Sequence, residues 1–220
     1  MGALTWPEAG VRSGAVLLVP IGSTEQHGPH LPLTTDTDIA VGLAARAAAA
    51  RSDVLVAPAL PYGASGEHAG FPGTLSIGQE ALELVVIELV RSATDTFGRV
   101  LLVNGHGGNT APLARAVARL RAEGRDVRSW SPRWRGDAHA GRTETSVHLA
   151  LAPSRVRPVR EAGAVAPLAQ LLPELRRSGV LAVSANGVLG DPTGSTAEQG
   201  ISLLHEAVAD LLAELEQWPA

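Results

Sequence analysis

The sequence predicts a three-layer α/β/α fold in which a mostly parallel sheet is flanked by helices. Apolar runs of strand length alternate along the chain with longer segments of helical character. The strand-like runs are apolar at almost every position, as expected when both faces of a parallel sheet are covered. The length of 220 residues suits one domain with a sizeable core, which we expect to span residues 1–220.

The amino-terminal half contains the clearest elements. Residues 16–21 form a continuous apolar run that stops at Gly22, which predicts a buried strand. Residues 38–51 are rich in alanine and contain few helix breakers, so we expect a helix there. A second strand is expected over residues 54–60. Apolar residues recur at core spacing over residues 79–97, which predicts a long helix.

The remaining elements continue the alternation. A third strand is expected over residues 100–103 and a fourth over 126–130, with a helix over 110–123 between them that ends at Gly124. Two prolines, Pro167 and Pro173, interrupt one of the later helical segments. The further predicted elements are helices over 143–151, 164–177 and 196–217 and a candidate strand over 180–183.

The composition argues against several functional classes. The net charge is −4 and the basic residues form no stripe, so nothing indicates nucleic-acid binding. The chain has no cysteine, which excludes disulfides, thiolate metal sites and a cysteine nucleophile. No apolar run reaches the roughly 18 residues of a membrane span, and the first residues lack the pattern of a signal peptide. We therefore expect a cytoplasmic protein that binds neither nucleic acid nor membrane.

The most unusual stretch is VPIGSTEQHGPHLPLTTDTD, residues 19–38, which leaves the first predicted strand. Its density of glycine and proline favours a shaped loop over a helix. Its acids and imidazoles are interleaved, which suits a divalent metal ion bound by carboxylate oxygen and imidazole nitrogen. A charged loop that is simply solvated is the alternative from this stretch alone. The potential ligands are Glu25, His27, His30, Asp36 and Asp38.

Further titratable residues follow the other three main strands. Five of the seven histidines lie in the four loops after these strands. The carboxyl ends of parallel strands share one edge of a sheet, and ligands bind at that edge. This distribution favours a metal site over histidines scattered through core or surface. The residues expected to converge are Glu25, His27, Asp36, His68, His106, His139 and Glu144.

The third loop, NGHGGN at residues 104–109, is glycine-rich but matches neither G-x-G-x-x-G nor a phosphate-binding loop with lysine. A histidine inside the turn is explained if the ring of His106 points into a site while the backbone packs tightly around it. Asn104 and Asn109 are expected to hold the turn through side-chain hydrogen bonds to the backbone. A purely structural turn remains the alternative.

The motifs together resemble the creatininase, or creatinine amidohydrolase, family. They are G-S-T-E-Q-H-G-P-H-L-P-L-x-T-D, F-P-G-T, N-G-H-G-G-N, H-A-G-x-x-E-T and the late G-D-P-T-G. Within the family, DAHAGRTETS and NGVLGDPTGSTAEQG are most similar to a peptidase that releases the modified C-terminal Val-Tyr pair of a precursor peptide. An alternative is a creatininase-like hydrolase of another small amide, of the creatinine or formamide type.

The resemblance implies two divalent metal ions per chain, of Zn, Fe or Mn. Glu25 and His106 would bind one ion and His27 the other, with Asp36 bridging them. Creatininase has a glutamate two residues after the histidine of the N-G-H loop, where this chain has Gly108. Another carboxylate must therefore serve the second ion.

Glu144 is our choice for this carboxylate, and Glu67 is the alternative. His139 is expected beside the substrate as general acid/base or hydrogen-bond donor, although it could instead orient a metal ligand. His30 and Asp38 are interpreted as supporting residues outside the metal coordination.

The resemblance also implies the reaction, which is hydrolysis of an amide bond by metal-bound hydroxide. No serine lies in a G-x-S-x-G elbow, so we expect no covalent intermediate. Family members form hexamers or related assemblies, which predicts a homo-oligomer. Trp134, Tyr62 and Phe71 are candidate walls of the substrate pocket. A nucleotide- or sugar-binding α/β protein and a degenerate, non-catalytic member are the competing classes.

Overall fold

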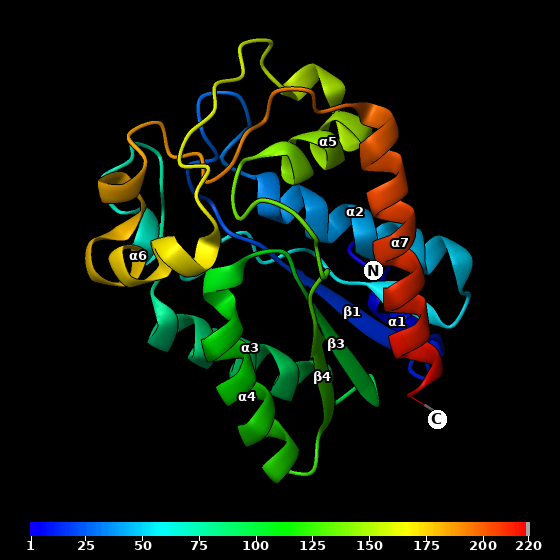
Figure 1. Ribbon diagram of the computed structural model, residues 1–220. Helices are drawn as coiled ribbons and strands as arrows, with labels where there is room; N and C mark the ends of the chain where they lie inside the picture. Colours follow the sequence, from blue (N-terminus) through cyan, green and yellow to red (C-terminus); the bar gives the residue numbers. More distant parts are fainter. Residues whose placement is uncertain (219–220) are drawn as a thin grey trace.

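The computed structural model describes residues 1–218, and its centre is a four-stranded, fully parallel sheet (Figure 1). The strand order is β2-β1-β3-β4. The central pair runs in register from Val16 opposite Arg99 to Ile21 opposite Asn104. The four strands are β1 (Val16–Ile21), β2 (Val54–Val56), β3 (Arg99–Asn104) and β4 (Asp126–Trp130).

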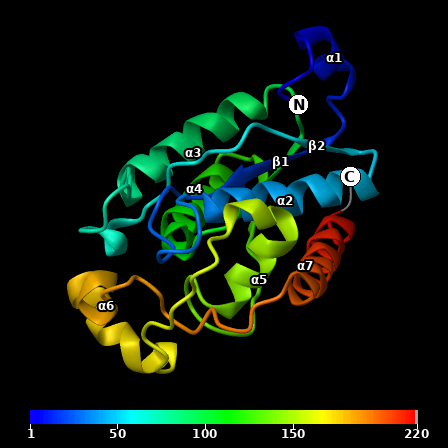
Figure 2. The ribbon, with the colours of Figure 1, turned by 90° about the horizontal axis from the view of Figure 1, so that it is seen from above.

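Helices cover both faces of the sheet, which confirms the predicted α/β fold (Figures 1 and 2). Because successive side chains of a strand point to opposite faces, Leu17 packs with α3 and α4 while Leu18 packs with α2 and α7. The helices are α1 (Trp6–Val11), α2 (Thr35–Ala50), α3 (Gln79–Ala93), α4 (Thr110–Ala122), α5 (Arg142–Leu151), α6 (Leu168–Val183) and α7 (Ala197–Glu216).

Several predicted boundaries are wrong. Helix α2 begins at Thr35 and not at residue 38, which puts Asp36 in its first turn. Strand β2 stops at Val56, although Leu60 still forms an isolated bridge with Ile21. Helix α3 ends at Ala93, four residues before the predicted end. The short helix α1 was not predicted.

The candidate strand over 180–183 is also wrong, because these residues are the end of α6. Gly179, with φ 76° and ψ −177°, breaks the helix there, and Val180 resumes it. A short apolar run after a glycine has the pattern of a buried strand as much as that of a buried helical turn, so the pattern alone could not decide.

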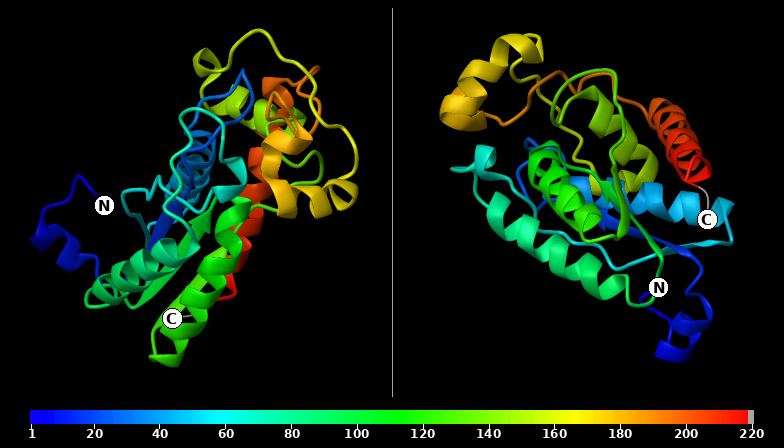
Figure 3. Two further views of the ribbon diagram at one scale, coloured as in Figure 1. Left: turned by 90° about the vertical axis from the view of Figure 1, so that its left-hand side faces the viewer. Right: turned by 90° about the horizontal axis from the view of Figure 1, so that it is seen from below.

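Helix α6 lies outside the three layers, beside the short helix η1 (Gly66–His68) (Figure 3). Together with the loop around η2 (Gly107–Asn109), it lies at the carboxyl edge of the sheet.

Within residues 1–218, no helix combines the length and apolar character that crossing a membrane requires.

Candidate metal centre

The carboxyl edge of the sheet gathers six titratable side chains from four segments, here called the sheet-edge cluster. The segment after β1 supplies two of them, the first turn of α2 one, the loop after β3 one, and the segment from the end of β4 into α5 two. All are buried except Glu144, whose side chain is 14% exposed. The members are Glu25, His27, Asp36, His106, His139 and Glu144.

Asp36 lies between two histidines. Its Oδ1 is 3.0 Å from His27 Nε2, and its Oδ2 is 3.3 Å from His106 Nδ1. Each carboxylate oxygen therefore lies close to a different imidazole, and the two imidazoles come from different loops. A carboxylate in this position has one oxygen for each of two neighbouring cations.

Glu25 completes the side of the cluster nearest His106. Its Oε2 accepts a hydrogen bond from Ser23 Oγ at 2.9 Å and lies 3.3 Å from His106 Nε2. Glu25 Oε1 and Asp36 Oδ2 are fully buried and form no well-aligned hydrogen bond among the described residues. Their near neighbours are imidazole nitrogens, with His68 Nε2 3.1 Å from Glu25 Oε1 and His106 Nδ1 3.3 Å from Asp36 Oδ2. Buried carboxylate oxygens that face imidazole nitrogens in this way fit a shared metal ion.

Three sets of potential ligand atoms meet the distance requirement for a shared ion. Within each set, one ligand atom from every member lies within 4.8 Å of the others. Carboxylate oxygen with imidazole nitrogen is a ligand chemistry that Zn, Fe and Mn share. The sets are Glu25, His27 and His139; Glu25, Asp36 and His106; and His27, Asp36 and Glu144.

The two candidates for the additional carboxylate occupy different places. Glu144 Oε2 lies 3.8 Å from His27 Nε2 and accepts a hydrogen bond from the backbone N–H of Ala140 at 2.6 Å. Glu67 Oε1 lies 3.4 Å from His106 Nε2, and its side chain is 36% exposed. Glu144 thus joins His27 and Asp36 in a ligand set, whereas Glu67 approaches the cluster only through His106.

Gly108 has no room for a side chain. A Cβ at this position would collide with the carbonyl oxygen of Ala64, with His106 Nε2 and with Glu67 Oε1. The carboxylate that creatininase carries at this position therefore has no space here, and the Glu67 carboxylate already lies beside it.

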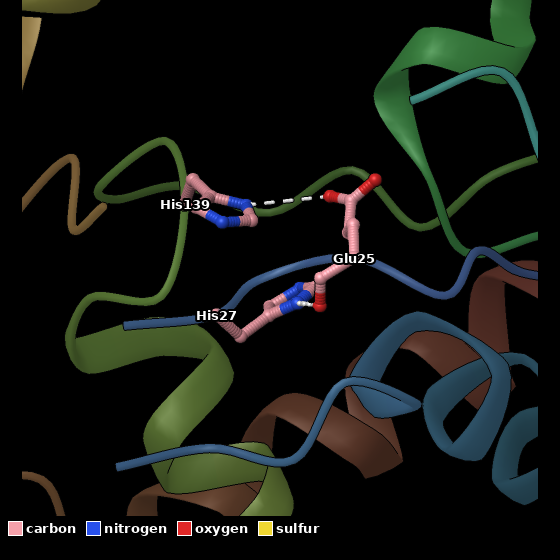
Figure 4. Close-up of side chains that lie close together, drawn as sticks. All are labelled: Glu25, His27 and His139. Atoms are coloured by element: carbon pink, nitrogen blue, oxygen red, sulfur yellow. Dashed lines mark hydrogen bonds and ion pairs between the residues drawn. The ribbon is translucent and has the colours of Figure 1, made fainter. Parts of the chain in front are cut away.

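His139 approaches Glu25 from a different segment than His27 does (Figure 4). Its Nε2 lies 2.9 Å from the carbonyl oxygen of Gln26, so Nε2 carries the proton and donates it. Nδ1 then presents its lone pair toward Glu25 Oε1, 3.8 Å away. The ring also lines a cavity of about 640 Å³ that lies beside the cluster. This orientation suits either proton transfer or metal ligation.

Gln26 is the most important residue that the sequence analysis missed. Its Oε1 accepts from the backbone N–H of Gly28 at 2.9 Å, which assigns its amide orientation. Its Nε2 can then donate to His68 Nδ1 at 2.8 Å and to the carbonyl oxygen of Gly187 at 3.0 Å. Gln26 lies between Glu25 and His27 in the sequence, and a polar side chain there could have indicated such a role.

Burial and neighbouring charges shift the pKa values of the cluster residues in opposite directions. Burial raises the pKa of Glu25 to about 7, and the nearby Asp36 adds to this effect. Burial opposes a charge on His27, but Asp36 outweighs it and raises the pKa of His27 to about 10. Burial also opposes ionisation of Asp36, yet His27 and His106 hold its pKa well below the usual range. Because metal ligation requires neutral imidazoles, binding of a cation must release these protons.

Burial lowers the pKa of His139 well below its ordinary value, and the neighbouring His27 lowers it further. The rings of His27 and His68 lie close to it, with centroids 4.3 and 4.5 Å away. His139 is therefore neutral at pH 7, with a free lone pair that can accept a proton.

The other predicted residues lie around the cluster. His30 Nε2 is hydrogen-bonded to Thr145 Oγ1 at 2.8 Å, and Asp38 pairs with Arg155 at 2.6 Å. Asn104 and Asn109 hold the loop between them, since Asn104 Nδ2 donates to the carbonyl oxygen of His106 and Asn109 Nδ2 to that of Gly22. These contacts confirm the predicted role of the two asparagines.

The predicted aromatic walls are wrong. None of Tyr62, Phe71 and Trp134 lines the cavity of about 640 Å³ beside the cluster. Trp134 packs against the core cluster on the α7 side, and Tyr62 is 44% exposed. Aliphatic residues from α4 and α6 form the cavity wall in their place.

Comparisons with known proteins agree with this geometry. The family model described as creatinine amidohydrolase matches residues 2–215. The mycofactocin precursor peptide peptidase of Mycobacterium tuberculosis is 51% identical over 92% of this chain and 85% of its own length. The peptidase of the same name from Mycolicibacterium smegmatis is 52% identical, over the same shares.

Solved structures show the same fold. A crystal structure of creatininase superposes with a TM-score of 0.83 at 27% identity, covering 100% of this chain and 98% of that one. Creatininase structures of this group include a Zn-Zn form and a Mn form. The chain therefore belongs to the creatininase family and is a hydrolase that acts on amide bonds.

Proposed function

We propose that this chain is a two-metal peptidase whose ions are held by the sheet-edge cluster. Glu25 and His106 would bind one ion, His27 and Glu144 the other, and Asp36 would bridge them. The observation that carries this proposal is the position of Asp36, with one oxygen toward His27 and the other toward His106.

When bound, two divalent ions lower the pKa of a water and polarise the scissile carbonyl. The chain's own residues bind the ions and transfer the proton. Asp36 and Glu25 supply the negative charge that binds the cations. His139 lies at the cavity wall with a free Nδ1 lone pair, which would accept a proton from the attacking water and then pass it to the leaving nitrogen. Gln26 would keep that ring in place through its backbone carbonyl.

The proposed substrate is the modified mycofactocin precursor peptide, from which the C-terminal Val-Tyr pair is released. Support comes from the relatives that carry this name, at 51–52% identity over 92% of this chain. The creatinine amidohydrolase of Pseudomonas putida is 36% identical, over only 53% of this chain. A peptide is therefore the better-supported substrate than creatinine.

The test is hydrolysis of the modified precursor peptide by the metal-loaded protein in water labelled with heavy oxygen, followed by mass spectrometry. We expect release of the C-terminal pair, with one label in the new carboxylate and no acyl-enzyme. Creatinine under the same conditions should react far more slowly. Release of creatine at a comparable rate, or a trapped acyl-enzyme, would contradict the proposal.

The identity of the ions and the assembly belong to the same proposal. Zn, Fe or Mn would occupy the two positions, and elemental analysis should find about two equivalents per chain. A cytoplasmic homo-oligomer, a hexamer or related assembly, is proposed from the family resemblance. Sedimentation of the purified protein measures the assembly.

A further inference from the structure

The cavity beside the sheet-edge cluster has one wall that the proposed chemistry does not use. The cavity measures about 640 Å³, which is the size of a small-molecule or peptide site and far more than two ions and a water need. Asp36, His106, His139 and Glu144 line one part of it. Another part, here called the α6 wall, consists of Leu168, Leu172, Leu175 and Val180.

The α6 wall is an apolar surface that lines the cavity and stays partly exposed. Helix α6 makes its extended contact with η1, where the backbone of Gly179 packs so closely on Glu67 that a Cβ would reach 2.8 Å from its carbonyl oxygen. Val180 is buried, but Leu168 is 44% exposed, and Leu172 and Leu175 are partly exposed toward the cavity. Exposed leucines that face a cavity indicate an apolar occupant.

Small apolar side chains of α4 line the same cavity as the α6 wall. They belong to Ala111 and Ala114. Arg176 is the only arginine among the lining residues, and it also borders the outer hollow beside Gly66 and Ala69, so it lies at the rim. Glu67 of η1 and Gln79 of α3 also line the cavity, so the α6 leucines and the α4 alanines offer contacts to an apolar group beside one carboxylate.

We infer that the α6 wall selects the substrate by binding the apolar side chain next to the scissile amide. The wall and the ligand residues share one cavity, so a substrate whose carbonyl reaches the cluster can place its neighbouring side chain against α6. This inference rests on the proposed function for the identity of the reacting bond. It adds that substrates with aliphatic or aromatic groups at this place are preferred over isosteric polar ones.

The experiment uses two probes of the same shape, N-acetyl-leucyl-leucinamide and N-acetyl-asparaginyl-asparaginamide, with the metal-loaded protein in titration calorimetry. We expect the leucyl probe to bind at least about tenfold more tightly than the asparaginyl probe. Leu172→Asp should reduce this preference to less than about threefold, and Leu172→Ala should weaken leucyl binding by about tenfold. Leu181→Asp is the matched control, because Leu181 lies on the same helix, is 46% exposed and does not line the cavity.

Equal binding of the two probes by the unmodified protein, or an unchanged preference in Leu172→Asp, would overturn the inference. If a second copy of the chain covers α6 instead, Leu172→Asp will alter the sedimenting mass and leave the preference intact, which also overturns it. Metal content, thermal unfolding and peptide hydrolysis are measured on the same samples. If a preparation binds two ions and hydrolyses peptide but binds both probes equally, the inference about the α6 wall is wrong and the proposed function stands. If the protein prefers the leucyl probe but binds no metal, the proposed function is wrong and the inference about the wall stands.

Discussion

The sheet-edge cluster and the α6 wall line one cavity but are built in different ways. The cluster residues are buried except for the partly exposed Glu144, and their side chains are held by neighbours such as Ser23 and Gln26. The wall uses aliphatic side chains on a helix outside the three layers, attached mainly at η1. The difference suggests that chemistry depends on exact residue types at the sheet edge, whereas selection depends only on the shape and polarity of a surface.

The largest effect is expected when Asp36, the residue between His27 and His106, is removed from the cluster. Asp36→Ala should lose both metal ions and all peptide hydrolysis, because no other carboxylate lies between His27 and His106 at hydrogen-bond distance of both. Elemental analysis and peptide turnover measure the two effects.

Asp38→Ala is the control for this change, since Asp38 lies two residues further along α2 and pairs with Arg155. It should keep both ions and most of the activity. Two equivalents of metal in Asp36→Ala would show that Asp36 does not bridge.

The next largest effect distinguishes the two candidate carboxylates. Glu144→Gln should lose about one equivalent of metal, because Glu144 shares a ligand set with His27 and Asp36. Glu67→Gln should retain both ions, since Glu67 Oε1 approaches only His106, at 3.4 Å. The same elemental analysis compares both variants, and the opposite pattern would assign the second ion to Glu67.

The sequence analysis anticipated the cluster far better than the wall. Glu25, His27 and His106 stand in strict motifs at strand ends, where the topology of a parallel sheet brings them together. Asp36 was expected on a loop and lies in the first turn of α2, because Thr-Asp-Thr-Asp gave no clear helix start. Asp36 follows β1 closely in the sequence, and this was enough to include it among the predicted ligands.

The wall was missed for physical reasons. Leu172 and Leu175 lie beside Pro173, which suggested an interrupted helix, and the break at Gly179 suggested a strand after it. Aromatic residues were expected to line the pocket because of their size, whereas the structure uses leucines. Which apolar residues face a cavity and which face the core depends on long-range packing, which periodicity alone does not contain.

A smaller effect concerns turnover without loss of metal. His139→Ala should keep about two equivalents of metal but lower kcat by roughly 10²–10⁴-fold, because it removes the proposed proton donor to the leaving nitrogen. Steady-state kinetics and elemental analysis on one preparation measure both quantities. Loss of one ion in this variant would instead make His139 a ligand, as its place in a set with Glu25 and His27 allows.

The smallest effect tests whether unpaired buried atoms alone indicate a metal site. His148 lies four residues after Glu144 on α5, is fully buried, and neither ring nitrogen has a hydrogen-bond partner among the described residues. Unlike the cluster, it has only Asp38 nearby, at 3.8 Å, and that carboxylate is already paired with Arg155. We therefore expect His148→Gln to leave metal content unchanged.

The effect of His148→Gln should appear in the pH dependence of the free energy of unfolding. Burial lowers the pKa of His148 from 6.5 to about 4; Asp38 opposes this shift, while Arg155 and His27 add to it. The unfolded chain therefore takes up a proton on His148 at a higher pH than the folded protein does. This histidine costs no stability above pH 6.5, and its cost grows as the pH falls from 6.5 to 4, by at most about 1.4 kcal/mol per pH unit.

Urea unfolding of the metal-loaded protein at several pH values, compared with His148→Gln, isolates this contribution from that of other groups. The difference in free energy of unfolding between the two proteins should change in favour of the variant as the pH falls through this window. His205→Gln, on the exposed side of α7, controls for the loss of a histidine as such. A difference that stays constant from pH 6.5 to 4 would mean that His148 is protonated equally in both states. Loss of metal in His148→Gln would extend the site beyond the sheet-edge cluster.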